Sequence, residues 1–143
     1  MSNFKVTGLF VDTSGWGNIV DRSQPYHQVA TNLYRLARQQ AGKVFTSNYV
    51  LAELIALLTS PLQIPRPRVV EFIQSLMQSP YVEIIHIDQE LDSLSWQLLS
   101  NRLDKSWSLV DCSSFLIMER LKLAEALTND HHFEQAGYIR LLK

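Results

Sequence analysis

The alternation of short apolar segments with longer amphipathic ones is the feature that most limits the folds open to this chain. Segments at residues 9–11, 44–46 and 81–87 are short and rich in Val, Ile and Phe, and helical patterns separate them. Strands that alternate with helices favour a parallel sheet, because each parallel connection must cross back over the sheet. The pattern therefore predicts an α/β fold with helices on both faces of the sheet.

Periodicity, prolines and caps assign the individual elements. Five strands are expected, at residues 9–11, 44–46, 81–87, 125–129 and 138–142. Helices are expected from residue 26 to about 39, from a cap at Asn48 to about 59, and at 69–78, 89–100 and 108–122. The "DTSG" that follows the first strand is interpreted as a turn. These elements predict a three-layer α/β/α sandwich around a central, mostly parallel, five-stranded sheet.

Composition limits the class of protein. A chain of 143 residues, 46% hydrophobic and 19% charged, is expected to form a single domain over residues 1–143. The formal net charge of -1 gives no strong global attraction to nucleic acid, so nucleic-acid binding would need local basic groups or bound cations. A single cysteine, Cys112, excludes an intrachain disulfide and suggests a reducing compartment. We expect a cytoplasmic protein with no membrane association, because no apolar window approaches about 18 residues.

Four acidic residues stand at positions where chemistry is expected, and each also has a simpler explanation. Asp12 and Asp130 directly follow expected strands, but either can be a turn or cap residue. Asp111 lies three residues after Ser108, which is the capping-box spacing. Glu53 has apolar residues three and four positions away on its helix, which predicts that it points toward the buried face; the alternative is a surface residue at the edge of that face.

The coincidence of the four acids is more informative than any one of them. In open parallel sheets, ligands bind beyond the carboxyl ends of the strands, where Asp12 and Asp130 are expected and where the helix of Glu53 begins. For Asp111 the pattern gives only a position in a first helical turn. Converging carboxylates repel one another unless a cation binds or their pKa values rise. Oxygen ligands select Mg²⁺ or Mn²⁺, and such ions hydrolyse phosphodiesters.

Four blocks of sequence resemble a known family. The blocks "FVDTSGW", "NYVLAEL", "DKSWSLVDCSSFLIME" and "ALTNDHHFEQAGY" stand in the order and approximate spacing of the PIN domain, in its bacterial VapC-like branch. The resemblance implies a PIN-like sandwich with Mg²⁺- or Mn²⁺-dependent endoribonuclease activity on RNA. It also implies a homodimer and, in a toxin–antitoxin pair, a cognate antitoxin protein that covers the site.

The resemblance also assigns roles to individual residues. It implies that the catalytic and metal-binding acids are Asp12, Glu53, Asp111 and Asp130. Ser14 and Thr128 match hydroxyl positions that support metal-bound water in such sites. The chain departs from its relatives at Lys122, where a helix-ending glycine is common, and at Asn129, where a bulkier apolar residue is common.

Other interpretations remain open at this point. His131 and His132 could form a zinc pair, but adjacent histidines on a turn are expected to point apart. A receiver-like phosphoacceptor module would use Asp88, although the chain lacks the paired acids and the lysine that such a module needs. A catalytically inactive PIN-like binding protein is the third alternative, which the presence of all four acids disfavours.

Overall fold

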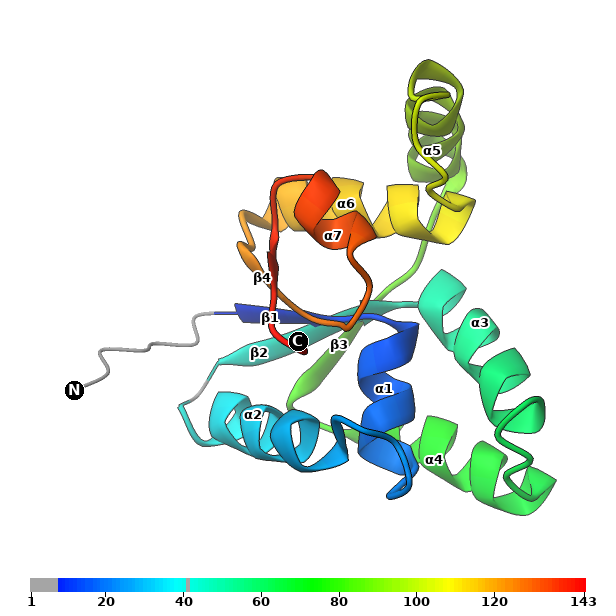
Figure 1. The fold of residues 1–143 in the computed structure, drawn as a ribbon, viewed down its shortest axis with the longest axis vertical. Coiled ribbons are helices and arrows are strands. Elements are labelled where there is room, and N and C mark those ends of the chain that lie inside the picture. The colour runs from blue at the N-terminus through cyan, green and yellow to red at the C-terminus, as the bar shows by residue number, and fades with distance from the viewer. Residues whose placement is uncertain (1–7, 41) are drawn as a thin grey trace.

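The computed structural model describes residues 8–40 and 42–143, and its centre is a five-stranded sheet (Figure 1). The strands lie in the order β3-β2-β1-β4-β5, and all four pairings are parallel. Their bounds are β1 (Gly8–Val11), β2 (Lys43–Ser47), β3 (Val82–Ile85), β4 (Glu125–Leu127) and β5 (Ile139–Arg140). The predicted α/β fold is therefore confirmed. Residues 1–7 and 41, part of the predicted single domain, lie outside the described residues.

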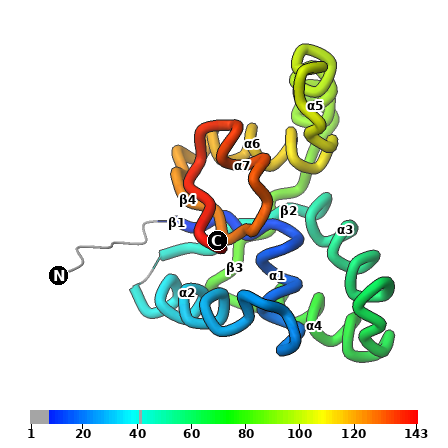
Figure 2. Tube along the Cα trace, viewed as in Figure 1, coloured from blue at the N-terminus to red at the C-terminus, as the bar shows by residue number. Residues whose placement is uncertain are grey.

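Helices cover both sides of the sheet. They are α1 (Thr13–Val20), α2 (His27–Gln39), α3 (Asn48–Thr59), α4 (Arg66–Gln78), α5 (Gln89–Asn101), α6 (Leu109–Leu121) and α7 (His132–Gln135). Helices α1, α2 and α4 lie on one side and α6 and α7 on the other, while α5 projects away from the sheet beside α6 (Figures 1 and 2). Within the described ranges, no helix is long and apolar enough to cross a membrane.

Helix α1 was not predicted, since its sequence was interpreted as a turn. Asp12 caps it, because its side chain accepts a hydrogen bond from the backbone N–H of Gly15. The helix lies so close to the sheet that a Cβ at Gly15 would stand 2.1 Å from the carbonyl oxygen of Leu127 at the end of β4. The glycine that suggested a turn is thus a packing requirement, and tertiary contact outweighs its low helix propensity.

Several boundaries differ from the prediction for local reasons. Ser47, and not Asn48, caps α3, since its hydroxyl accepts the N–H of Val50; the side chain of Asn48 instead accepts the N–H of Ile87. Helix α4 begins earlier than predicted because proline is tolerated in a first turn, where Pro67 lies. Strands β3, β4 and β5 are shorter than predicted.

The hydrophobic core lies on both faces of the central strands, and it holds helix α1 in place against the sheet. Phe10, Val11 and Val44 are fully buried, as expected for a sheet covered on both sides. Trp16 of α1 is fully buried as well, and its indole N–H donates to the hydroxyl of Thr46 at 3.1 Å. Burial of α1 against the sheet holds its first turn, with the residue that caps it, at the carboxyl end of β1.

Candidate active site

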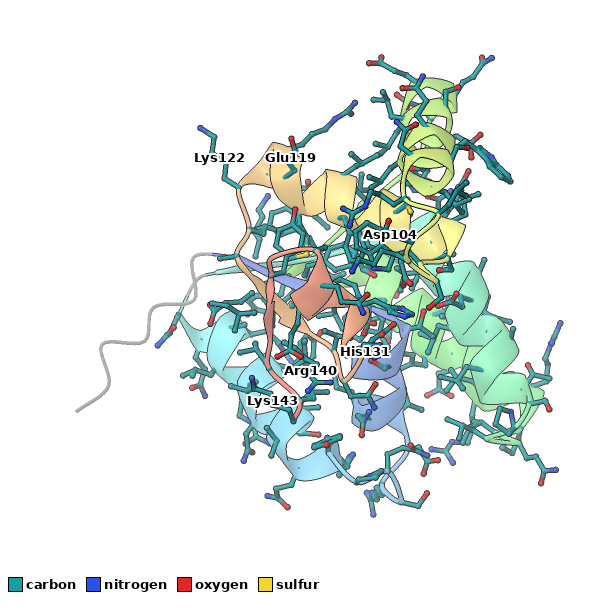
Figure 3. All side chains as sticks on the ribbon, turned by 45° about the horizontal axis from the view of Figure 1, so that its top comes forward. Asp104, Glu119, Lys122, His131, Arg140 and Lys143 are labelled. Atoms are coloured by element: carbon teal, nitrogen blue, oxygen red, sulfur yellow. The ribbon has the colours of Figure 1, made fainter. Side chains whose placement is uncertain are left out.

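The four predicted acids line one cleft at the carboxyl edge of the sheet. The cleft has a volume of about 400 Å³. Its lining residues come from both sheet and helix ends and are Asp12, Thr13, Ser14, Glu53, Leu57, Asp111, Asn129, Asp130 and His131. Figure 3 labels His131, one of these lining residues. Acids from four separate segments are thus brought to one place.

Asp12 forms the buried floor of the cleft, with 8% of its surface exposed. Its Oδ1 accepts hydrogen bonds from the N–H of Gly15 at 2.9 Å and from the hydroxyl of Ser14 at 2.8 Å. Its Oδ2 accepts the hydroxyl of Thr128 at 2.7 Å. Burial raises the pKa of Asp12 to about 7, with a further contribution from the charge of Asp130, although these hydrogen bonds oppose the shift.

Ser14 and Thr128 connect the ends of β1 and β4. Their hydroxyl oxygens lie 3.2 Å apart, and each also accepts a backbone N–H: that of Asn129 at 3.0 Å for Ser14, and that of Asp130 at 3.0 Å for Thr128. The resemblance implied a role for them in supporting metal-bound water. In this structure both hydroxyls donate to Asp12, so they orient that carboxylate.

Glu53 follows the alternative interpretation, a surface residue at the edge of the apolar face. It is exposed and not turned toward the buried face, because it lies at the edge of the apolar stripe of α3, next to the exposed Ala52 and the buried Leu54. Its Oε1 accepts a hydrogen bond from the hydroxyl of Thr13 in the first turn of α1. This contact keeps Glu53 at the rim of the cleft. Thr13 was not among the predicted site residues.

Asp111 both caps a helix and lines the cleft. Its backbone N–H donates to the hydroxyl of Ser108 at 3.0 Å, and its Oδ2 accepts the N–H of Ser108 at 3.1 Å, which completes a capping box. Within the described chain, Oδ1 has no hydrogen bond and remains available to a ligand. Burial is the main cause that raises the pKa of Asp111, and the charge of Asp130 adds to it.

Asp130 begins the short helix α7. Its Oδ1 accepts the backbone N–H of His132 at 2.9 Å. The two departures from the family pattern do not displace it. Lys122 itself adopts the left-handed conformation, with φ of 56°, that a helix-ending glycine would supply, and Asn129 lines the cleft.

His132 joins two of the acids. Its Nδ1 lies 3.1 Å from Oδ2 of Asp111 and 3.2 Å from Oδ1 of Asp130, and its Nε2 lies 3.3 Å from the hydroxyl of Ser106. The prediction that the adjacent histidines point apart is wrong, since the ring centroids of His131 and His132 are 4.5 Å apart. Side-chain rotamers decide this contact.

The donor set of the cleft fits a hard divalent cation. The four acids offer carboxylate oxygens, and none of the described residues that line the cleft is Lys or Arg. Burial is the main cause that raises the pKa values of Asp12 and Asp111, and the charge of Asp130 adds to both shifts. Mg²⁺ and Mn²⁺ prefer such oxygen ligands. The arrangement is therefore suited to binding these ions and, through them, a phosphate group.

Other features of the structure do not compete with this cleft. Two larger cavities, of about 480 Å³ and 600 Å³, lie elsewhere, the second against the edge strand β3, and none of the four acids lines them. Asp88 follows the edge strand β3, caps α5 by accepting the N–H of Leu91, and is not among the residues of the cleft. A phosphoacceptor site at Asp88 would therefore lie apart from the four acids of the cleft. Cys112 is fully buried.

Comparison with known proteins gives consistent matches over nearly the whole chain. A sequence model of the PIN domain family matches residues 9–138. The 23S rRNA-specific endonuclease VapC20 of Mycobacterium tuberculosis is 27% identical over 133 residues, which cover 93% of this chain and 97% of the relative.

Solved structures give the same picture of the fold. The crystal structure of VapC20, described as a sarcin–ricin loop cleaving toxin, matches with a TM-score of 0.82 at 27% identity over 94% of this chain and 99% of that one. The structure of FitAcB from Neisseria gonorrhoeae matches with a TM-score of 0.64 at 18% identity over 94% and 96%.

Proposed function

The chain belongs to the PIN domain family, and from that premise we propose that it is a Mg²⁺- or Mn²⁺-dependent endoribonuclease, a toxin of the VapC type. The single observation that carries the proposal is the convergence of Asp12, Glu53, Asp111 and Asp130 on one cleft whose described lining contains no Lys or Arg. The similarity to an rRNA endonuclease, over almost all of both chains, supports RNA as the substrate.

The four carboxylates would hold the ion, which when bound supplies a positive charge to the scissile phosphate and activates water for attack on it. The chain's own contribution is to place the acids. Ser14 and Thr128 orient Asp12 on the floor, and the capping box holds Asp111 in the first turn of α6. Glu53, exposed at the rim, is the acid most accessible to an entering substrate. Without a cation, these acids would repel a phosphate backbone.

The proposal is tested by cleavage of labelled structured RNAs, including a sarcin–ricin loop fragment, in Mg²⁺, Mn²⁺ or EDTA. Asp111→Asn is the test variant, because the amide can keep the cap while the charge is lost. Asp88→Asn is the matched control, since Asp88 is also a helix-capping aspartate but lies outside the cleft.

The expected result is cleavage that requires the metal, survives in Asp88→Asn and falls by about 10²–10³-fold in Asp111→Asn. Equal cleavage by the wild type and Asp111→Asn would contradict the proposal and indicate a contaminating nuclease. Absence of cleavage together with labelling of Asp88 by a small phosphodonor, lost in Asp88→Asn, would favour the receiver-like alternative. Binding of RNA without cleavage by any form would favour an inactive PIN-like binding protein.

The remaining implications of the family resemblance stay predictions. A cognate antitoxin should bind over the cleft and abolish cleavage, and the protein should be a homodimer that acts in the cytoplasm. Sedimentation of the purified protein would determine its oligomeric state. Co-purification with the product of a neighbouring small gene, followed by the RNA cleavage assay, would identify an antitoxin.

A further inference from the structure

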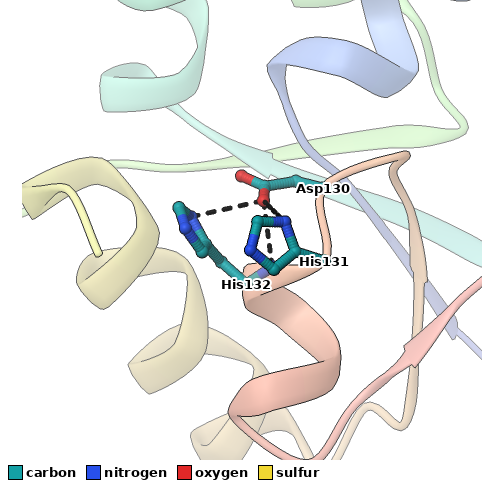
Figure 4. A group of neighbouring side chains, drawn as sticks. All are labelled: Asp130, His131 and His132. Atoms are coloured by element: carbon teal, nitrogen blue, oxygen red, sulfur yellow. Dashed lines mark hydrogen bonds and ion pairs between the residues drawn. The ribbon is translucent and has the colours of Figure 1, made fainter. Parts of the chain in front are cut away.

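Two imidazoles and a carboxylate converge at the start of α7. Asp130 Oδ1 lies 3.2 Å from Nδ1 of His132 and 3.8 Å from Nδ1 of His131, as Figure 4 shows. One ligand atom from each of the three residues lies within 4.8 Å of the others. The oxygen-only set proposed above for Mg²⁺ or Mn²⁺ does not include either histidine. The cluster is therefore a chemically different ligand set that shares one acid with the cleft.

The spacing fits a tetrahedral ion better than an octahedral one with oxygen ligands. Zinc binds imidazole nitrogen and carboxylate oxygen at about 2.0–2.2 Å, so its ligand atoms lie about 3.3–3.5 Å from one another. The separation of His132 from Asp130 is already close to this value, and Nδ1 of His132 is also 3.1 Å from Asp111 Oδ2. His131 lies farther out, with its Nδ1 3.8 Å from Asp130 Oδ1, and must move toward the other ligands. Its side chain is 63% exposed, so it is free to move.

The far side of the His132 ring provides the support that a ligating histidine usually has. Histidines that bind a metal through one nitrogen almost always donate the other N–H to a nearby oxygen, which fixes the ring. Nε2 of His132 lies 3.3 Å from the hydroxyl of Ser106, on the loop before α6. With a metal on Nδ1, the Nε2–H group would donate to this oxygen. This contact is independent of the convergence of the three ligands.

We propose that Asp130, His131 and His132 form a zinc site, with Asp111 within reach as a fourth ligand. Because this site takes Asp130 from the oxygen-only set, zinc and Mg²⁺ or Mn²⁺ exclude one another in the cleft. Zinc is then an inhibitory ion for the nuclease. This last consequence rests on the proposed function, whereas the existence of the site does not.

Zinc binding is measured directly, without RNA, by competition with a chromophoric chelator, and Co²⁺ absorption reports the ligand geometry. His131→Ala is the test variant, because His131 is exposed and its loss leaves the fold intact. It should weaken zinc binding more than about tenfold, since even the loss of a residue that only hydrogen-bonds to a metal ligand typically costs 10–100-fold. Mn²⁺ affinity should stay unchanged. His86→Ala is the matched control, because His86 is also exposed but lies outside the cluster.

The results separate this proposal from the proposed function. A selective loss of zinc affinity in His131→Ala, with an intense tetrahedral Co²⁺ spectrum in the wild type, supports the site even if no RNA is cleaved. Equal changes in zinc and Mn²⁺ affinity, no change in either, or a weak octahedral Co²⁺ spectrum would overturn it even if the nuclease is active. If RNA is cleaved in Mg²⁺, the zinc concentration for half-inhibition should rise in His131→Ala relative to His86→Ala.

Discussion

Thr128 donates its hydroxyl to Asp12 Oδ2 over 2.7 Å, across 116 positions of sequence. Both residues are buried, and each follows a strand at the carboxyl edge of the sheet. The same hydroxyl oxygen accepts the N–H of Asp130 at 3.0 Å, so one side chain sets the positions of two acids of the cleft. The positions of Asp12 and Asp130 in the cleft therefore depend on the uncharged residue Thr128.

Replacement of Thr128 by valine is expected to weaken both the fold and metal binding. Thr128→Val keeps the shape of the side chain but leaves a buried carboxyl oxygen without its donor, which costs about 1–3 kcal/mol of unfolding free energy. It also removes a hydrogen bond that lowers the pKa of Asp12, so less of the carboxylate is available to a cation near neutral pH.

Urea unfolding in EDTA and a Mn²⁺ titration at neutral pH measure the two effects. Thr128→Ser is the control, because it keeps the hydroxyl and loses a methyl group. If Thr128→Ser and Thr128→Val bind Mn²⁺ equally well, the hydroxyl has no role in placing Asp12.

The raised pKa of Asp12 predicts a distinctive dependence of stability on pH. In the folded protein Asp12 holds its proton up to pH of about 7, whereas in the unfolded chain it loses it near 3.8. Between these values the unfolded state binds fewer protons, so its ionisation lowers the free energy of unfolding as pH rises. The full effect is at most on the order of 4 kcal/mol. Added Mn²⁺ should reverse the loss, and more strongly at high pH.

Asp12→Asn provides the comparison, since an amide does not titrate and can still accept the N–H of Gly15. In EDTA this variant should be more stable than the wild type at pH 8, and the difference should shrink as pH falls from about 7 to about 3.8. Thermal melts of both proteins across this range, with and without Mn²⁺, test the idea. If the stability of the wild type instead rises relative to Asp12→Asn as pH increases over this range, the pKa of Asp12 is not raised.

The fold was predictable from sequence because its strands are short apolar runs that helices separate. Helix α1 was not, since "TSGWGNIV" contains two glycines and resembles a turn until its packing against β4 is known. The order of the strands was also beyond the sequence, because it depends on which edges pair and not on local periodicity. Local pattern thus determines the elements, and tertiary packing determines their neighbours.

The sequence predicted which acids form the site, but not how all of their side chains are oriented. Asp12 and Asp130 follow strands, so topology placed them correctly. The orientation of Glu53 was left open, because a residue at the edge of an apolar stripe can face either way. The contacts of His132 with Asp111 and Asp130 depend on rotamers that spacing does not encode.

Of the two glycines in α1, Gly15 is the one at which we expect any side chain to destabilise the fold. A Cβ there would meet the Leu127 carbonyl oxygen at 2.1 Å and Val11 Cγ1 at 2.8 Å, so the helix would have to move away from β4. Gly15→Ala should lose about 1–3 kcal/mol or more of unfolding free energy, as is typical of overpacking, and should displace Asp12.

Gly17 in the same helix is the matched control. Its Cβ would meet only the Cδ2 atom of Leu57, at 3.1 Å, at the end of a side chain that can turn away. The gain in helix propensity, up to about 1 kcal/mol, then offsets the cost in Gly17→Ala. Urea unfolding of the two variants measures the contrast. Similar stabilities would mean that the approach of α1 to β4 is not as close as described.

The two roles of Asp111, as cap and as acid, should be separable by mutation. Ser108→Ala removes the hydroxyl that accepts the Asp111 N–H, and should cost about 0.5–2 kcal/mol of unfolding free energy as an N-cap loss, while the carboxylate stays in the cleft. Asp111→Asn keeps an oxygen for the Ser108 N–H but loses the charge. It should therefore lower RNA cleavage by about 10²–10³-fold, the usual cost of removing one electrostatic group. Urea unfolding and single-turnover cleavage should therefore rank the two variants in opposite order: Ser108→Ala should be the less stable, and Asp111→Asn should be the less active. Matching rankings would mean that Asp111 acts only through the stability of α6.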